Sequence, residues 1–194
     1  LQTSGQNNVG VGVAAGFNNL TGTQNVYVGI NAGKGSTGYS NSNTTAIGSQ
    51  ALYNILGGSD NTAVGREAGL VITSGANNTC LGSNAGVVIT TGSTNTCIGR
   101  GAGGNTTTDG GVFLGNLAGS GDNASNILYI ARSNEGSCND STWIYGHTDG
   151  SCIQGDNATA WSQTSDERIK KNITDSTKGL TEINAIQVRN FEYR

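Results

Sequence analysis

The sequence predicts an all-β protein: a parallel β-solenoid of about seven 17-residue coils that assembles as a homotrimer. Three observations lead to this prediction. A short motif, in which an apolar residue precedes Gly, two variable residues and Ala, recurs at nearly constant spacing. Gly makes up 32 of the 194 residues, while Pro and Met are absent. Each copy of the motif holds few apolar side chains, so one coil buries little by itself.

The motif occurs seven times, and its first Gly falls 17, 19, 17, 17, 17 and 16 residues after the previous one. These glycines are Gly12, Gly29, Gly48, Gly65, Gly82, Gly99 and Gly115. A fixed short period indicates one structural unit stacked on itself. A disordered linker of the same composition would need no such register.

The residues before each Gly are expected to form a short strand. In the copy at 61–65, Thr62 and Val64 lie on one face and Ala63 on the other, because strand side chains alternate. The position of Thr62 holds Val or Thr in every copy, and such β-branched residues favour strands. The position of Val64 always holds Val, Ile or Leu. We expect this apolar ladder to be the core.

Two further positions of the motif predict turns. The Gly permits a left-handed or strained backbone, or a close approach of two backbones. The Ala is the same in all seven copies, so little space is expected there, either inside a second turn or against a symmetry mate. Asn stands four residues before the Gly in five copies, namely Asn8, Asn25, Asn61, Asn78 and Asn95. Asn forms turns and can stack into a ladder of amide hydrogen bonds.

Stacking of the coils predicts a rod. Seven coils spaced by about 4.8 Å give a length of roughly 30 Å. A single chain would have a thin core, whereas three chains around one axis would pool their apolar ladders. The sequence therefore favours an intertwined or side-by-side homotrimer.

The charge pattern excludes several function classes. A net charge of −3 gives no electrostatic footprint for nucleic acid, and only residues 168–171 are locally basic. No apolar run of about 18 residues suggests a membrane-spanning helix. His147 has no second ligand near it in the sequence, and no CxxC pair occurs, so neither a metal site nor a cofactor is predicted.

The cysteines leave two interpretations open for one pair. Cys80 and Cys97 are one repeat apart at the same position, so they would lie on neighbouring rungs about 4.8 Å apart. That distance allows a disulfide. Alternatively, and this is the interpretation we favour, they are two small buried thiols in a position that Ala46 and Ala63 occupy in other coils.

The periodicity fades after Gly119, which predicts three segments. Residues 1–120 form the repeat solenoid, 121–162 a β neck with larger core residues such as Ile153 and Trp161, and 163–194 the start of a small α+β domain. Within the third segment, Leu180, Ile183 and Ile186 fit a short amphipathic helix. Residues 188–193 alternate like a strand.

Two stretches resemble known families. The pattern Asn-Thr-Ala-Val-Gly-x-x-Ala-Gly, over residues 8–120, resembles the head repeats of trimeric autotransporter adhesins. It is even more similar to repeat arrays in phage and large-virus tail fibres. The run from Ser165 to Ile173, Ser-Asp-Glu-Arg-Ile-Lys-Lys-Asn-Ile, with Trp161-Ser162 before it, resembles the start of the intramolecular chaperone domain of endosialidase-type tail spikes.

The second resemblance implies a self-cleaving trimerisation chaperone. Ser165 would be the nucleophile and Lys170 the general base, because a Ser hydroxyl is inert until a base takes its proton. Asp166 would flank the scissile bond. Without the resemblance, Ser165 is a turn or helix cap and the lysines are a solvated pair. Any enzymatic activity is thus expected to be autoproteolysis, with no external substrate.

These observations predict a structural fibre on the surface of a virion, extracellular, that attaches to a host glycan or protein. Its partners would be its own copies and the host surface, without nucleic acid or membrane insertion. A bacterial adhesin of the trimeric autotransporter type is the first alternative. An ice- or polysaccharide-binding solenoid is the second, because Thr45, Thr62, Thr79 and Thr96 form a regular rank.

Overall fold

The computed structural model describes residues 4–104, 109–120, 124–131, 142–146 and 152–154. The chain divides into two compact units, Leu1–Trp161 and Ser162–Arg194. All regular structure in the described residues is β-strand, which confirms the predicted all-β class for that part. The expected chaperone segment at 163–194 lies outside the described residues, as do Trp161 and the side chain of Ile153.

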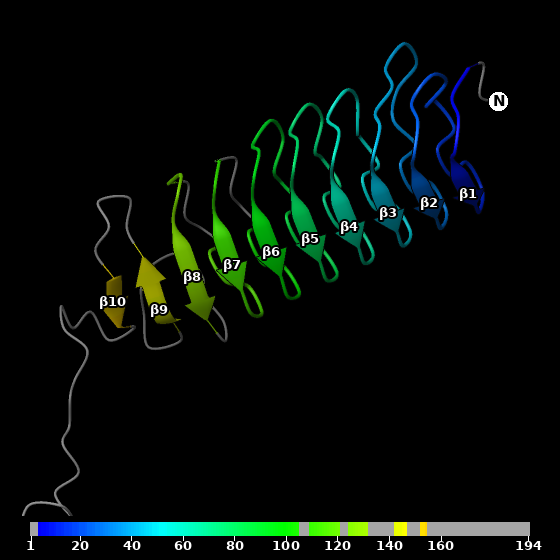
Figure 1. Cartoon of the computed structure of the whole chain (residues 1–194). Helices are drawn as coiled ribbons and strands as arrows, with labels where there is room; N and C mark the ends of the chain where they lie inside the picture. The colour runs from blue at the N-terminus through cyan, green and yellow to red at the C-terminus, as the bar shows by residue number, and fades with distance from the viewer. Residues whose placement is uncertain (1–3, 105–108, 121–123, 132–141, 147–151, 155–194) are drawn as a thin grey trace, which may run out of the picture. The chain divides into compact units, whose positions relative to one another are not determined.

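The described strands form one sheet of ten in sequence order, as Figure 1 shows. Strands β1 to β8 pair in parallel, and β9 and β10 pair antiparallel. The strands are β1 Val9–Val11, β2 Val26–Val28, β3 Thr45–Ile47, β4 Thr62–Val64, β5 Thr79–Leu81, β6 Thr96–Ile98, β7 Val112–Leu114, β8 Leu128–Ala131, β9 Thr142–Gly146 and β10 Cys152–Gln154. Neighbours in sequence are therefore neighbours in space, as stacking requires.

The sheet pairs each motif copy with the next in identical register. Thr62 of β4 pairs with Thr79 of β5, and Val64 pairs with Leu81. The same pairing places Cys80 opposite Cys97. One short strand per coil, stacked in parallel over seven copies, confirms the predicted β-solenoid.

The Gly after each strand meets both expectations for that position. Gly82 has a φ of 131°, a conformation that side chains other than Gly rarely adopt. A Cβ atom on Gly82 would lie 2.6 Å from the carbonyl oxygen of Gly99 in the next coil. The glycines of neighbouring coils thus stack backbone against backbone, and a larger residue would separate the rungs.

Left-handed residues bend the chain at three more places in each coil. They lie two and four residues after the Gly, as at Glu67 (φ 57°) and Gly69 (φ 59°), and one residue before the Asn position, as at Asp60 (φ 59°). The predicted turn at the Asn thus has its left-handed residue one position earlier. Leu52 (φ 51°) stands where most coils have Gly.

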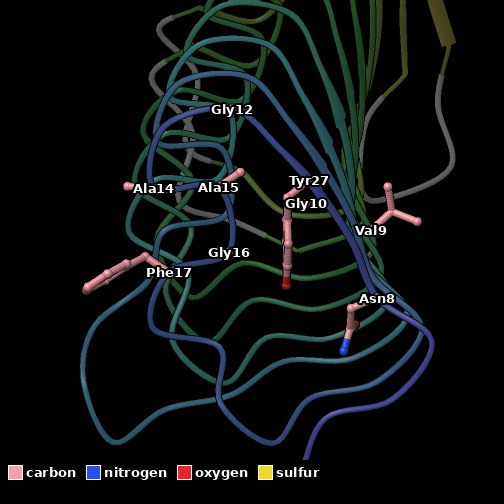
Figure 2. A pocket seen from close by; sticks show the side chains of 9 residues that line it. All are labelled: Asn8, Val9, Gly10, Gly12, Ala14, Ala15, Gly16, Phe17 and Tyr27. Carbon is pink, nitrogen blue, oxygen red and sulfur yellow. The ribbon is translucent and has the colours of Figure 1, made fainter. Parts of the chain in front are cut away.

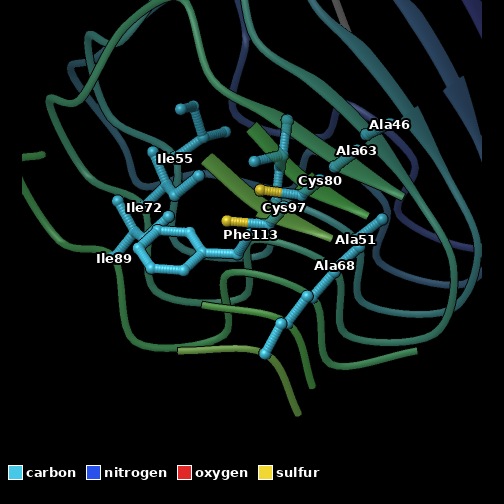
Figure 3. Close-up of a cluster of buried hydrophobic side chains, with 14 of the residues drawn as sticks. Ala46, Ala51, Ile55, Ala63, Ala68, Ile72, Cys80, Ile89, Cys97 and Phe113 are labelled. Atoms are coloured by element: carbon cyan, nitrogen blue, oxygen red, sulfur yellow. The ribbon is translucent and has the colours of Figure 1, made fainter. Parts of the chain in front are cut away.

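The core occupies the opposite side of the strands from the one predicted. The middle residue of strands β2 to β7, such as Ala63, Cys80 or Phe113, is buried (Figure 3). Val64 is 37% exposed, so the ladder expected to be the core lies on the outer surface of the single chain. The prediction was wrong because alternation states which residues share a face but not which face the coil encloses.

Core volume is shared between the middle strand residue and the fourth residue after the motif Gly. The Tyr27 ring fills the space beside Gly33, where a Cβ would lie 2.1 Å from a ring carbon. In the next coil a small Ala46 accompanies the large Leu52, and both are buried. The invariant Ala of the motif is also buried, as Ala68 is in the fourth coil, so its expected tight space lies inside the coil.

The predicted Asn ladder is present, at the turn that precedes each strand. Asn78 Oδ1 accepts hydrogen bonds from the backbone N and the Nδ2 of Asn95, both at 3.0 Å. Asn78 Nδ2 donates to the Gly92 carbonyl at 2.9 Å and to Asn61 Oδ1 at 3.1 Å. In the third coil Thr44 replaces Asn, and its backbone N donates to Asn25 Oδ1. The buried Asn side chains thereby form hydrogen bonds with backbone groups of the turns, which have no partner in a strand.

The array extends one rung further than the repeat motif. Strand β8 pairs in parallel with β7, so the first strand of the expected neck continues the solenoid sheet. The sheet changes to antiparallel pairing at β9. The Phe113, Tyr129 and Tyr145 rings follow one another, with centroids 6.1 and 4.5 Å apart. Ile127, Tyr129 and Tyr145 are thus large buried side chains in the described residues after the last motif copy.

Candidate interaction surface

The outer face of the sheet carries two parallel ranks of side chains, one from each end residue of the strands. The first rank holds Thr or an aliphatic residue, and the second holds only Val, Ile or Leu. The second rank consists of Val11, Val28, Ile47, Val64, Leu81, Ile98, Leu114 and Ile130. In-register pairing keeps these residues directly above one another.

This face is strongly apolar for a solvent-facing surface. Val11 is 57% exposed, and Ile47, Val64 and Ile98 are 37–39% exposed. No charged residue occurs in strands β1 to β8. A contiguous exposed apolar patch of this kind marks a contact site rather than an ordinary solvated surface. Burial of this face would remove apolar area from water and thereby stabilise the protein.

A polar corner follows the strand face along the coil. Arg66 forms an ion pair with Glu67, and its Nη2 donates to Asn84 Oδ1 at 2.9 Å. Asn84 Nδ2 donates in turn to Glu67 Oε2 at 2.9 Å. In a later coil Arg100 Nε donates to Asn116 Oδ1 at 3.0 Å. These exposed side chains satisfy one another between coils and delimit the apolar face on one side.

A hollow of about 290 Å³ opens at the first coil, and its lining includes Asn8, Ala15, Phe17 and Tyr27 (Figure 2). Gly10, which also lines it, occupies the middle strand position. The Tyr27 hydroxyl donates to Asn41 Oδ1 at 2.6 Å and accepts from Asn19 Nδ2 at 2.9 Å. Burial raises the pKa of Tyr27, so it stays neutral at physiological pH.

The two buried thiols are free, in agreement with the interpretation of Cys80 and Cys97 as core residues. The hydrogen bond to Cys80, with burial, raises the pKa of the Cys97 thiol. A raised pKa suppresses the thiolate, which is the reactive form. These cysteines therefore fill core volume in the reduced state.

The predicted catalytic residues Ser165, Asp166 and Lys170 all lie outside the described residues. Within the described part of the chain, no three His, Cys, Asp or Glu side chains gather into a group that could hold a metal ion. The same part contains no helix that is long and apolar enough to cross a membrane.

A second exposed feature was missed by the sequence analysis. The fifth residue after the motif Gly forms a column that reads Phe17, Lys34, Tyr53 and Leu70 in the first four coils. The backbone links successive coils here, since Gly35 N donates to the Tyr53 carbonyl at 3.0 Å. The sequence shows these residues at a fixed offset from the motif Gly. The 19-residue spacing between Gly29 and Gly48 marks an insertion beside the column.

Comparisons with protein-family models, with curated proteins and with solved structures found no match for this chain.

Proposed function

We propose that this chain is the shaft segment of a homotrimeric virion fibre that attaches to a host-cell surface. The observation that supports it is the exposed apolar ladder on the outer face of β1 to β8. Three copies that turn this face toward a common axis would bury it. The resulting core would be shared by three chains, with the small single-chain cores around it.

The strand face would supply only part of the interface of a side-by-side trimer. Eight parallel strands spaced by about 4.8 Å extend over about 34 Å. Two ranks of side chains about 7 Å apart make this a narrow face of a few hundred Å², below the ~800 Å² per partner of a stable interface. Flanking residues contribute the rest, and Val13 and Ile30, just after the first two glycines, are 72% and 55% exposed.

The C-terminal segment supplies the folding step in this proposal. Neighbouring coils share the same register pattern, so three chains that slip by one repeat would keep most of their contacts. A trimerising domain at one end would fix the register before the shaft closes. The segment 163–194 would begin that domain, and Ser165 would cut the chain with Lys170 as the base and Asp166 beside the scissile bond.

Two measurements on the full-length gene product test this function. Sedimentation velocity should give the mass of a trimer, and intact mass spectrometry should give two pieces separated at Ser165. A Ser165→Ala variant should stay whole and still assemble. A monomer would refute the shaft proposal. An uncut wild-type chain that is trimeric would refute only the cleavage step.

A bacterial surface adhesin of the trimeric autotransporter type is the runner-up. It shares the trimeric solenoid, so sedimentation does not distinguish the two. The segment from Ser165 to Ile173 favours the viral assignment, and cleavage at Ser165 would decide for it.

A specific observation also favours ice binding as a second candidate. Thr45, Thr62, Thr79 and Thr96 form an in-register rank on a sheet face of regular spacing. Such a face would have to be free, so this function requires a monomer that inhibits ice recrystallisation. A trimer without this activity excludes it.

A further inference from the structure

We infer that the column Phe17–Lys34–Tyr53, with the neighbouring loop at 35–40, is a binding site for a glycan that carries a carboxylate. This inference deepens the attachment function proposed above, on which it rests for its biological role. It assigns the contact with the host to one corner of the first three coils.

Exposed aromatic side chains gather at this corner. Phe17 is 57% exposed, Tyr39 is 53% exposed and Tyr53 is half-buried. The other aromatic side chains that the structure describes, Tyr27, Phe113, Tyr129 and Tyr145, are buried in the solenoid core. In the following coils the column continues as Leu70, Val87 and Gly104, without an aromatic ring. The aromatic character is thus a property of the first three coils and not of the repeat.

The column is held on a rigid scaffold. Asn18 N donates to the Lys34 carbonyl, and Gly35 N donates to the Tyr53 carbonyl, both at 3.0 Å. Asn18 Nδ2 also donates to the Gly35 carbonyl at 3.0 Å. Phe17 and Tyr53 are therefore two coil spacings apart, about 10 Å, with Lys34 on the coil between them. That span accommodates more than one sugar ring.

The two-residue insertion of the second repeat supplies a side wall. Its loop contacts the first coil just beyond Phe17: Thr37 Oγ1 lies 3.4 Å from Asn18 Oδ1, and Thr21 N donates to Ser40 Oγ at 3.2 Å. This loop carries Tyr39. The insertion thus adds an exposed aromatic residue and several hydroxyl groups next to the column.

Lys34 provides a positive charge that no carboxylate neutralises within the described residues. Its Nζ donates to the Tyr53 hydroxyl at 3.3 Å and lies 5.2 Å from the centre of the Tyr53 ring. The described carboxylates have other partners, because Glu67 pairs with Arg66, Asp60 accepts from Asn43 and Asp109 accepts from the Ser93 backbone. Both contacts hold the ammonium group at the rim of the Tyr53 ring.

This combination matches the chemistry of an acidic sugar. The C–H groups on one face of a pyranose ring carry partial positive charge and stack on the negative face of an aromatic ring. A sugar carboxylate then forms a charge-assisted hydrogen bond with Lys34. Loop hydroxyls and backbone groups remain for the sugar hydroxyls. A sialic acid and a uronic acid share this chemistry, and the experiment below separates them.

The site stays accessible in the proposed trimer. In Figure 2, Phe17 points outward on the side of the first coil away from Val9, whose side chain belongs to the apolar sheet face. Burial of that face around a trimer axis therefore leaves the column on the outside. Three copies on one fibre would bind a multivalent surface with avidity even where each site is weak.

The test is a binding titration of the full chain followed by NMR saturation transfer. The probes are 3′-sialyllactose and tetragalacturonate, with lactose as the neutral counterpart. We expect binding of at least one acidic probe, and the one that binds identifies sialic or uronic acid as the sugar. Lys34→Met should weaken that probe about tenfold and leave lactose unchanged. Phe17→Ala and Tyr53→Ala should each weaken all probes. Tyr53→Phe keeps the ring, so it should leave lactose unchanged and weaken the acidic probe less than Tyr53→Ala does.

Arg100→Met is the matched control, because it removes an exposed cation from a distant coil. Each variant should keep the wild-type melting temperature and sedimentation coefficient. The inference is overturned if neither acidic probe binds, or if Lys34→Met and Phe17→Ala bind like the wild type. A trimer that binds no probe refutes the site but not the fibre. A monomer that binds through Lys34 refutes the trimeric fibre but not the site.

Discussion

The apolar face is tested by replacing three of its residues together with Thr, in the variant Ile47→Thr, Val64→Thr and Ile98→Thr. Thr is β-branched and already present in the neighbouring rank, so the strands should keep their conformation. Because these side chains point away from the single-chain core, the monomer should fold with little loss of stability. The trimer interface, in contrast, would lose an apolar side chain on three rungs.

The magnitude follows from the exposed fractions. Complete burial of a Val or Ile side chain is worth about 1.5–3 kcal/mol, and 37–39% of each residue is still exposed in the single chain. Assembly should therefore gain about 0.8 kcal/mol per side chain. Three substitutions in three chains remove nine such contributions, about 7 kcal/mol per trimer. The association constant should fall about 10⁵-fold, which raises the midpoint concentration about 300-fold.

Sedimentation velocity over a concentration series measures this midpoint, and circular dichroism reports the strand content. The control variant is Val71→Thr, Val87→Thr and Val88→Thr, which makes three comparable changes away from the sheet face. It should assemble like the wild type. If the strand-face variant keeps the wild-type midpoint, or if the control weakens assembly equally, the outward face is not the interface.

Three further predictions concern the single-chain fold. Gly82→Ala should destabilise it by more than about 3 kcal/mol, because the φ of 131° is unfavourable for Ala and the Cβ would clash with the Gly99 carbonyl. Urea denaturation measures this loss. Gly57→Ala, with open space around it, should be nearly neutral. Asn78→Ala should cost about 3 kcal/mol or more in thermal or urea unfolding, since it removes the buried side-chain partner of the Asn95 N–H and the Gly92 carbonyl. Asn116→Ala, which removes an exposed hydrogen bond from Arg100, should cost under about 1 kcal/mol. The free energy of unfolding should decrease as pH rises above about 10, the ordinary pKa of Tyr, because the folded state holds the pKa of Tyr27 higher and resists its ionisation. The free energy should change by up to about 1.4 kcal/mol per pH unit. An unchanged slope in Tyr27→Phe would contradict this assignment.

Two features of the structure could be predicted from residue type at a fixed offset from the motif Gly. The copy that contains Leu52 is the one motif copy without the second Gly, and its strand carries the small Ala46. The large Tyr27 instead faces Gly33. This exchange of volume between two motif positions indicates that they share one interior. Phe17, Lys34 and Tyr53 likewise share one offset from the motif Gly, but their residue types differ from coil to coil, so periodicity does not reveal the column.

The sequence by itself determined the period, the strand positions, the Gly stack and the Asn ladder. These are local or nearest-coil properties, since each depends on backbone conformation or on the identical position one repeat away. Only the tertiary structure decided which side of the strand is inside. Alternation is symmetric, and the turns set the direction in which the coil closes. They close it around Ala63, and the interior has limited room, because a large strand residue such as Tyr27 faces a Gly and a small one such as Ala46 accompanies Leu52. Val64 therefore remains outside, where another chain can cover it.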